Sequence, residues 1–296
     1  MNGTSIQSDI RYWLRQGNMV NNLLFWNIII FLVINLVRLI GYLAQLPGLF
    51  PVYVYDQITL HSQLSQFITK PWGLFTYMFS HVGIFHIFFN MLNLYWFGNL
   101  FRSFLGNRRI LPLYLLGGIT GGLLYMLCYN LFLPQPVDGT MLGASAAVMC
   151  ILVATATLMP NYEIGLLFFG GIRLKWIAIA LIVLGLISIP DGNLGGIIAH
   201  MGGALMGFCY IKILQSGTDL CHPLIRFFEM ISNIGTRKSQ PERKFKPKKS
   251  PLKVVRNNDE NPQSKLDLLL DKINEKGYNS LSNEEKAWLD KVSKER

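Results

Sequence analysis

Six stretches of mostly apolar residues run through the first 215 residues, separated by short segments that contain charged residues, glycine or proline. A helix that crosses a membrane needs about 20 such residues, and the stretches reach or approach that length. They lie at 23–40, 82–101, 110–132, 143–158, 174–189 and 194–214. The pattern predicts an all-α membrane protein, with a bundle of six transmembrane helices within residues 23–215.

The segment between the first two predicted spans, residues 41–80, is long but still rich in aromatic residues such as Tyr53, Tyr55 and Trp72. Amphipathic aromatic side chains gather where a membrane meets water. We therefore expect this segment to lie in the interface or to dip into the edge of the bilayer. A small folded loop in water is the alternative.

Composition excludes an ordinary soluble domain. The 296 residues are 51% hydrophobic and 15% charged, against roughly 25% charged in soluble domains, and the mean hydropathy is +0.33. Disordered and collagen-like chains are excluded on the same grounds. The cysteines lie in or beside apolar stretches without a CxxC pair, so they predict neither a disulfide framework nor a metal site.

The net charge of +10 would suggest nucleic acid, but its distribution argues against such a partner. Residues 1–215 hold 10 basic and 5 acidic residues, whereas the shorter segment 216–296 holds 17 and 12. Within 237–256, nine basic residues stand against Glu242 alone. A basic segment beside a membrane contacts anionic lipid head groups; a solvated linker, supported by several prolines, is the alternative.

The positive charges also predict an orientation. They precede the first span, lie between the second and third and between the fourth and fifth, and follow the sixth, at Arg11, Arg15, Arg102, Arg108, Arg109, Arg173 and Lys175 and in the basic tail. Because positive loops stay in the cytoplasm, both termini, including residues 1–22, are expected there. The first apolar stretch starts late and lacks a small-residue cleavage site, so no cleavable signal peptide is predicted.

Polar side chains inside predicted spans are costly and suggest function. The second span carries His86, Asn90 and Asn93 on one helical face, and His81 comes just before it. The fourth span opens with Gly143-Ala144-Ser145. The sixth contains His200 beside a small-residue repeat that lets helix backbones approach closely, made of Ala199, Gly203 and Gly207.

These residue types fit hydrolysis by serine, which needs a nucleophile, a base and an oxyanion site. Ser145 can supply the hydroxyl, and His200 can take its proton. Spans two to six contain no acid, so the pair is a dyad rather than a triad. Zinc is an alternative for the histidines, but no HExxH motif is present. A transport pathway would need charged groups within the spans; apart from Arg38, only Lys175 and Lys212 near span ends are present, so this alternative is not favoured.

In their order along the chain, these motifs resemble those of the rhomboid family of intramembrane serine proteases. The matches are His81-x4-His86-x3-Asn90, Gly143-Ala144-Ser145 and Ala199-His200-Met-Gly-Gly203-x3-Gly207. The resemblance implies that Ser145 is the nucleophile and His200 the general base. It also implies an oxyanion hole formed by His86, Asn90 and the Ser145 N–H, with His81 holding the outer loop and with Gly143, Gly203 and Gly207 as structural residues near the site.

The resemblance further implies an intramembrane endopeptidase that cuts transmembrane substrates near the outer membrane face, without a cofactor or metal. The loop around Asp191-Gly192-Asn193 would be a mobile cover. The alternative is a catalytically inactive rhomboid-like protein that binds transmembrane clients; the presence of both Ser145 and His200 favours the enzyme. From size and tail, we expect a bacterial inner membrane.

Three positions depart from the family pattern. Ala146 stands where glycine is common, and Met149 where an aromatic residue often stacks on the histidine. Gly73 follows Trp72 where arginine is common, which puts a loop contact in doubt.

The tail is predicted to form a basic flexible linker, 216–262, and a small helical module, 263–296. Helical spacing at 266–273, a stop at Gly277 and a capping-box pattern at Ser282–Glu285 predict two helices. The module's partner is unknown; docking to a partner and mere solubility are both open.

Overall fold

The computed structural model describes residues 17–132, 139–166, 170–187, 193–235 and 262–294. The chain divides into two compact units, residues 1–237 and 238–296. The first unit contains all of the predicted spans, and the second contains the tail.

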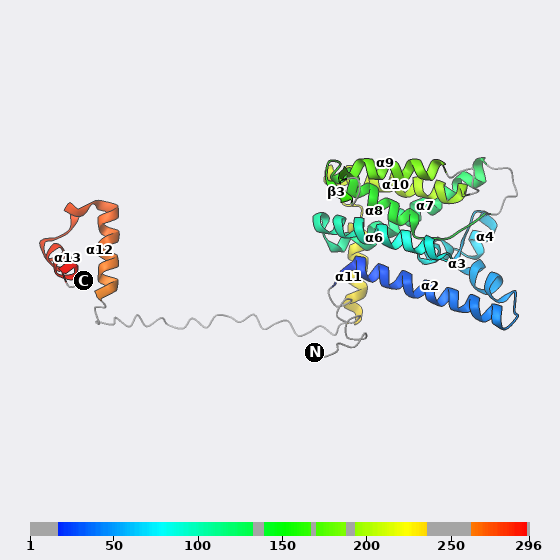
Figure 1. Cartoon of the computed structure of the whole chain (residues 1–296), viewed down its shortest axis with the longest axis horizontal. Coiled ribbons are helices and arrows are strands. Elements are labelled where there is room, and N and C mark those ends of the chain that lie inside the picture. Colours follow the sequence, from blue (N-terminus) through cyan, green and yellow to red (C-terminus); the bar gives the residue numbers. More distant parts are fainter. Residues whose placement is uncertain (1–16, 133–138, 167–169, 188–192, 236–261, 295–296) are drawn as a thin grey trace. The chain divides into compact units, whose positions relative to one another are not determined.

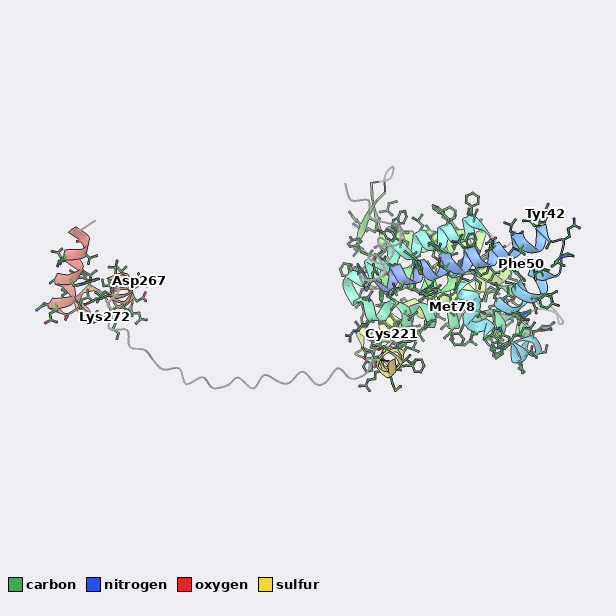
Figure 2. The ribbon with its side chains drawn as sticks, turned by 90° about the horizontal axis from the view of Figure 1, so that it is seen from below. Tyr42, Phe50, Met78, Cys221, Asp267 and Lys272 are labelled. Carbon is green, nitrogen blue, oxygen red and sulfur yellow. The ribbon has the colours of Figure 1, made fainter. Side chains whose placement is uncertain are left out.

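Six apolar helices run alongside one another in the first unit (Figure 1), and each corresponds to one predicted span. They are α2 (Met19–Leu43), α6 (Ile84–Leu105), α7 (Ile110–Phe132), α8 (Ser145–Leu158), α9 (Leu174–Ile187) and α10 (Leu194–Gln215). Large apolar side chains on the outside of the bundle are exposed, whereas others, such as Met78, lie inside (Figure 2). An exposed apolar surface of this kind is suited to lipid. The predicted helical membrane bundle is therefore confirmed.

The helices differ in length. Three of them, α2, α10 and α7 with its preceding turn, are long and apolar enough to cross a membrane. α6 joins them when it is taken together with the segment 73–79, from which it is bent by 89°. α8 and α9 have 14 residues each, about 21 Å of helix against a hydrocarbon thickness of about 30 Å. The count of six spans stays a prediction.

Glycines bring α10 into direct backbone contact with α8 and α7. A Cβ atom on Gly203 would overlap the Ala146 carbonyl, and one on Gly207 would overlap the Cys150 carbonyl. On the next face, a Cβ on Gly202 would lie 2.8 Å from the Gly121 Cα atom. Small residues at such positions let backbones pack where no hydrophobic effect drives helices together.

A second row of glycines lies on α7 and was not identified from the sequence. A Cβ on Gly117 would lie 2.9 Å from the Cys150 sulfur, and one on Gly121 would lie 2.6 Å from the Ala146 Cβ. α8 is therefore held between two helices whose facing surfaces are mostly backbone, and its residues from 146 to 156 are almost all buried.

The long segment after α2 folds into short elements. These are a π-helical turn η1 (Pro51–Tyr55), α3 (Asp56–Ile58), β1 (Leu60–His61), α4 (Leu64–Thr69), α5 (Gly73–Thr76) and the 3₁₀ turn η2 (Tyr77–Phe79). β1 pairs antiparallel with β2 (Thr140–Met141), with Leu60 opposite Met141. Aromatic side chains such as Tyr53 and Trp72 are exposed. The segment is both folded and aromatic on its outside, and it is attached to the chain that leads into α8.

A β-hairpin connects α8 to α9, where the apolar pattern predicted no strand. β3 (Glu163–Leu166) and β4 (Gly170–Arg173) pair antiparallel, with Glu163 opposite Arg173. The two strands have four residues each and are largely exposed, so a search for long apolar stretches does not detect them.

One further helix, α11 (His222–Gly235), lies inside the range 216–262, for which a flexible linker was predicted. Its start is fixed by Asp219, whose carboxylate accepts hydrogen bonds from Arg109 Nε (2.8 Å), the Tyr210 hydroxyl (3.2 Å) and the Cys221 N–H (2.9 Å). Burial raises the pKa of the Cys221 thiol to about 12. The first part of that range is thus a helix attached to the bundle. The rest, 236–261, lies outside the described residues.

The second unit contains α12 (Pro262–Lys276), a 3₁₀ turn η5 (Tyr278–Ser280) and α13 (Asn283–Lys294). α12 ends before Gly277, which has a φ of +77°. The Ser282 hydroxyl accepts from the Glu285 N–H (3.2 Å), and a Glu285 carboxylate oxygen accepts from the Ser282 N–H (2.7 Å). This reciprocal pair is a capping box. Lys272 of α12 donates to the same carboxylate at 2.8 Å, which ties the two helices together.

The Glu285 carboxylate gives this unit a pH dependence. The hydrogen bonds from Lys272 and the Ser282 backbone lower its pKa. A lowered pKa in the folded state contributes stability above the ordinary glutamate range, and that stability is lost as the pH falls through the folded pKa. We expect Glu285→Ala to speed amide hydrogen exchange at the start of α13 in the full chain at neutral pH.

The difference in amide exchange rate between Glu285→Ala and the parent should shrink as the pH is lowered. Glu284→Ala is the matched control, because Glu284 is the neighbouring exposed glutamate. Equal effects of the two substitutions would show that the capping box does not stabilise α13.

Candidate active site

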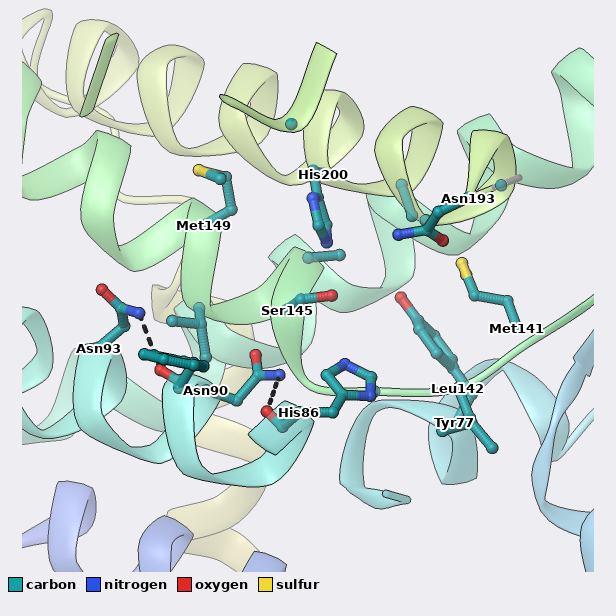
Figure 3. A pocket seen from close by; sticks show the side chains of 18 of the residues that line it. Tyr77, His86, Asn90, Asn93, Met141, Leu142, Ser145, Met149, Asn193 and His200 are labelled. Atoms are coloured by element: carbon teal, nitrogen blue, oxygen red, sulfur yellow. Dashed lines mark hydrogen bonds between the residues drawn. The ribbon is translucent and has the colours of Figure 1, made fainter. Parts of the chain in front are cut away.

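A cavity of about 640 Å³ lies between α6, α8, α9 and α10. The side chains of Ser145, His200, His86 and Asn90 all line it, although they come from three different helices (Figure 3). The structure thus brings together residues that the sequence analysis singled out on the second, fourth and sixth predicted spans.

Ser145 is the first residue of α8, and its hydroxyl faces the cavity (Figure 3). The residue before it, Ala144, has no side chain that could cap the helix. The first intrahelical bond runs from the Val148 N–H to the Ala144 carbonyl (2.9 Å). Since the first N–H groups of a helix lack intrahelical partners, the N–H groups at Ser145 and Ala146 are available beside the hydroxyl. The positive end of the helix dipole lies at the same point.

The turn before Ser145 is held by groups far away in sequence. The Gly143 N–H donates to the Tyr77 carbonyl (2.8 Å), and the Ala144 N–H donates to His81 Nε2 (3.2 Å). His81 is fully buried, and its ring lies edge-on to that of His86 with 5.1 Å between centroids. The Tyr77 hydroxyl in turn donates to the Gly118 carbonyl of α7. The segment between α2 and α6 (residues 44–83, called the outer segment from here on) includes His81. This segment therefore positions the chain that carries Ser145.

His200 lies on α10 one turn before Gly203, which contacts the Ala146 carbonyl of α8. Its imidazole points from α10 toward the level of the Ser145 hydroxyl (Figure 3). Within the described residues the two side chains form no hydrogen bond, although they face the same space. In enzymes without substrate, the bond between nucleophile and base is often long and forms fully only in the complex.

His86 and Asn90 face the cavity from α6. The His86 ring lies against Gly143, which has a φ of +128°; a Cβ there would be 2.6 Å from His86 Cε1. The Asn90 side-chain N–H₂ donates to the His86 carbonyl at 2.8 Å, and that of Asn93 donates to the Phe89 carbonyl at 2.8 Å (Figure 3). An amide has two N–H donors, so each bond leaves one for another acceptor.

The departures from the family pattern have structural counterparts. Met149 lines the cavity one turn after Ser145, and its side chain is turned away from the His200 ring (Figure 3). Gly73 lies against the chain before β1, where a Cβ would be 2.7 Å from the Thr59 carbonyl. The absence of arginine at position 73 put a side-chain contact of this loop in doubt. In the structure, a backbone contact is made at this position.

Across the described ranges, no group of three or more His, Cys, Asp or Glu side chains is arranged to hold a metal ion. The chemistry that the cavity can support with its own groups is proton transfer by imidazole and attack by a hydroxyl.

Comparison with protein families agrees with the arrangement of these helices. Residues 69–217, half of the chain, match the rhomboid domain. The chain belongs to the rhomboid family. This confirms the resemblance seen in the sequence, and rhomboid proteins are in general intramembrane serine proteases.

Individual rhomboid relatives match about half of the chain. Presenilin-associated rhomboid-like protein A, mitochondrial, of Danio rerio is 31% identical over 174 residues, which cover 55% of this chain and 43% of the relative. RHOMBOID-like protein 12, mitochondrial, of Arabidopsis thaliana is 33% identical over 144 residues, 44% of this chain and 43% of the relative. The matches therefore span less than half the length of these relatives.

These rhomboid relatives contradict the predicted location. They are named as mitochondrial proteins, so the expectation of a bacterial inner membrane with both termini in the cytoplasm is wrong. The charge pattern reports only which loops share a side of the membrane. It contains no information on which membrane that is.

The second unit of this rhomboid protein has a separate relationship. Residues 255–295 match a family of unknown function, DUF6576. The match covers α12 and α13.

Several residues of the site were missed by the sequence analysis. Tyr77 and Met141 line the cavity, and Gly117 and Gly121 pack against α8 and hold it in place. A short motif reveals none of them, because each contacts residues that are distant in sequence. Of the predicted cover loop, only Asn193 belongs to the described residues; 188–192 lie outside them.

The contact between Gly143 and His86 yields a prediction. Gly143→Ala places a methyl group against the imidazole and forces a non-glycine residue to φ +128°, so we expect a loss of about 1–3 kcal/mol in the free energy of unfolding. The control is Gly83→Ser, since position 83 caps α6 with an ordinary φ of −86° and a Cβ there would lie 3.7 Å from His86.

The two variants are compared by their midpoints of unfolding in lipid–detergent micelles. Equal midpoints for the two variants would contradict the close packing of Gly143 on His86.

Proposed function

We propose that this rhomboid protein is an intramembrane serine endopeptidase that uses Ser145 and His200 as a catalytic dyad. The observation that carries the proposal is the meeting of the two side chains in one cavity. Ser145 is the first residue of α8, and the His200 imidazole projects from α10 toward it. Membership of a family of intramembrane serine proteases supports the same chemistry.

In this mechanism the Ser145 hydroxyl attacks the carbonyl carbon of the substrate peptide bond, while His200 accepts the hydroxyl proton. His200 then returns this proton to the departing amine, and an acyl-enzyme remains on Ser145. A water molecule, deprotonated by His200, cleaves the ester in the second half of the reaction. A dyad suffices because α10 itself restrains the imidazole.

The oxyanion that forms in each half needs donors aimed at it. The Ser145 N–H lies at the positive end of α8. His86 is fixed against Gly143, and Asn90 retains an amide N–H after bonding to the His86 carbonyl. Donors preorganised in this way are worth more in a water-poor site than in water.

The substrates of this chemistry would be transmembrane segments. A peptide bond inside a helix is shielded by its own turn, so the segment must be locally extended before Ser145 can attack. The cavity includes Tyr77 and Met141, which belong to the outer segment and to β2. Cleavage is therefore expected near the membrane face on which residues 44–83 lie.

Substitution of the dyad tests the proposal. Ser145→Ala and His200→Ala should each lower cleavage of single-span model substrates in liposomes by at least about a thousandfold. The double variant should be little worse than either single one, because the two groups act as a unit. Ser103→Ala and His222→Ala are matched controls at exposed positions outside the cavity.

Cleavage is measured by gel and mass spectrometry. Unchanged cleavage in Ser145→Ala would overturn the dyad. If the parent cuts no substrate but retains intact single-span clients on purification, the client-binding alternative replaces the enzyme.

The oxyanion donors allow a second test with a control from the same helix. Asn90→Ala should lower kcat by about ten- to a hundredfold, with a smaller effect on KM, since the lost donor acts on charge that forms in the transition state. Asn93→Ala removes the same kind of bond one turn further along α6 and should change kcat little. Equal losses in both variants would contradict the role of Asn90.

A further inference from the structure

Helix α11 runs across the direction of the spans rather than along it. In Figure 1 the apolar helices run horizontally and α11 is vertical; in Figure 2, beside Cys221, α11 is seen end-on. The two views agree that α11 lies near the end of the bundle where α2 begins and α6 ends. Helices that cross a membrane run roughly along its normal, so a helix perpendicular to them at one end of the bundle runs roughly parallel to the membrane plane.

The side chains of α11 divide into three groups around its axis. Leu224, Ile225 and Phe228 are partly buried, and Ile225 packs against the core of the bundle. Phe227, Met230 and Ile231 are 49%, 60% and 49% exposed. Their spacing of three and four residues places them together on one side of the helix.

Polar residues occupy the remaining side. Glu229 forms an ion pair with Arg108 (3.0 Å), so its charge is compensated. Arg226 is exposed, and in the described ranges it forms no ion pair with an acidic residue. The chain that follows carries nine basic residues between 237 and 256 against one acidic residue. The uncompensated charge on α11, and the net charge of the sequence that follows it, are therefore positive.

We propose that α11 is an interfacial anchor helix that binds an anionic lipid surface. Phe227, Met230 and Ile231 insert into the boundary between head groups and acyl chains, and Arg226 contacts negatively charged head groups. Amphipathic helices with an apolar side and basic flanks bind membranes in this way.

A lipid surface fits α11 better than a protein partner does. The helix lies in the membrane plane at the depth of the head groups, where lipid is the surrounding medium, and its uncompensated charge is of the sign that anionic lipids attract. The bonds from Arg109, Tyr210 and Cys221 to Asp219 fix the start of α11 to the bundle. The bilayer then holds an element that is rigidly connected to α10.

Depth measurement on the full chain in nanodiscs tests this assignment. A nitroxide is attached at Met230→Cys, on the exposed apolar side, or at Ser232→Cys. Ser232 is two residues further on and points in nearly the opposite direction. Cys128 and Cys209 are only partly buried and are replaced by alanine to avoid labelling. Collision rates with oxygen, which concentrates in lipid, and with a water-soluble nickel complex report the depth.

We expect the label at position 230 to meet oxygen more often than nickel, and the label at 232 to show the reverse. Frequent collision with nickel at both positions would place α11 in water and overturn the proposal. Protection from both reagents at position 230 would show that a protein segment covers it, which also overturns the proposal.

Lipid selectivity tests the role of the charge. Nanodiscs are made from equal parts phosphatidylcholine and phosphatidylglycerol, and spin-labelled phosphatidylglycerol reports the fraction of lipid immobilised by the protein. Arg226→Gln should lower the preference for phosphatidylglycerol over phosphatidylcholine by about fivefold at this site, whereas Arg226→Lys should retain it. No difference between the two variants would overturn the contact of Arg226 with anionic head groups.

Discussion

The close contact between the backbones of α10 and α8 underlies the geometry of the site. Gly203 faces the Ala146 carbonyl with no room for a Cβ. His200 lies three residues before Gly203 on the same helix, and Ser145 directly precedes Ala146. This one contact therefore sets the imidazole at the level of the hydroxyl. A side chain at 203 would push the helices apart, and displacements of about 1 Å are enough to impair catalysis.

A second set of interactions controls the chain just before α8. Gly143 and Ala144 donate to the Tyr77 carbonyl and to His81, and the hydroxyl of Tyr114, buried on α7, donates to the neighbouring Met78 carbonyl at 2.6 Å. The outer segment is thus part of the scaffold of the site. It connects α7 to the turn that precedes Ser145, the nucleophile of the proposed dyad, and it carries exposed aromatic side chains such as Tyr53 and Trp72 on its outside.

The opposite end of the bundle serves attachment rather than chemistry. There the Asp219 carboxylate accepts hydrogen bonds from Arg109 in the turn before α7, from Tyr210 of α10 and from the Cys221 N–H just before α11. Since α10 carries His200 near one end and contacts Asp219 through Tyr210 near the other, the same helix links the cavity to the membrane-plane helix. The bundle therefore places the cavity at one end and the proposed lipid-binding helix at the other.

The sequence by itself determined the apolar helices and the candidate residues, because the length of an apolar stretch and the spacing of polar residues within it are local properties. The stretch 110–132 coincides with α7, and the ordered motifs around His86, Ser145 and His200 contain several of the residues that line the cavity. Tertiary structure alone decided that Gly117 and Gly121 of α7 pack against α8, that Tyr77 supports the turn at Gly143, and that the start of α11 is bound to the bundle through Asp219. These features depend on contacts between residues far apart in the chain, and such contacts leave no local signal in the sequence.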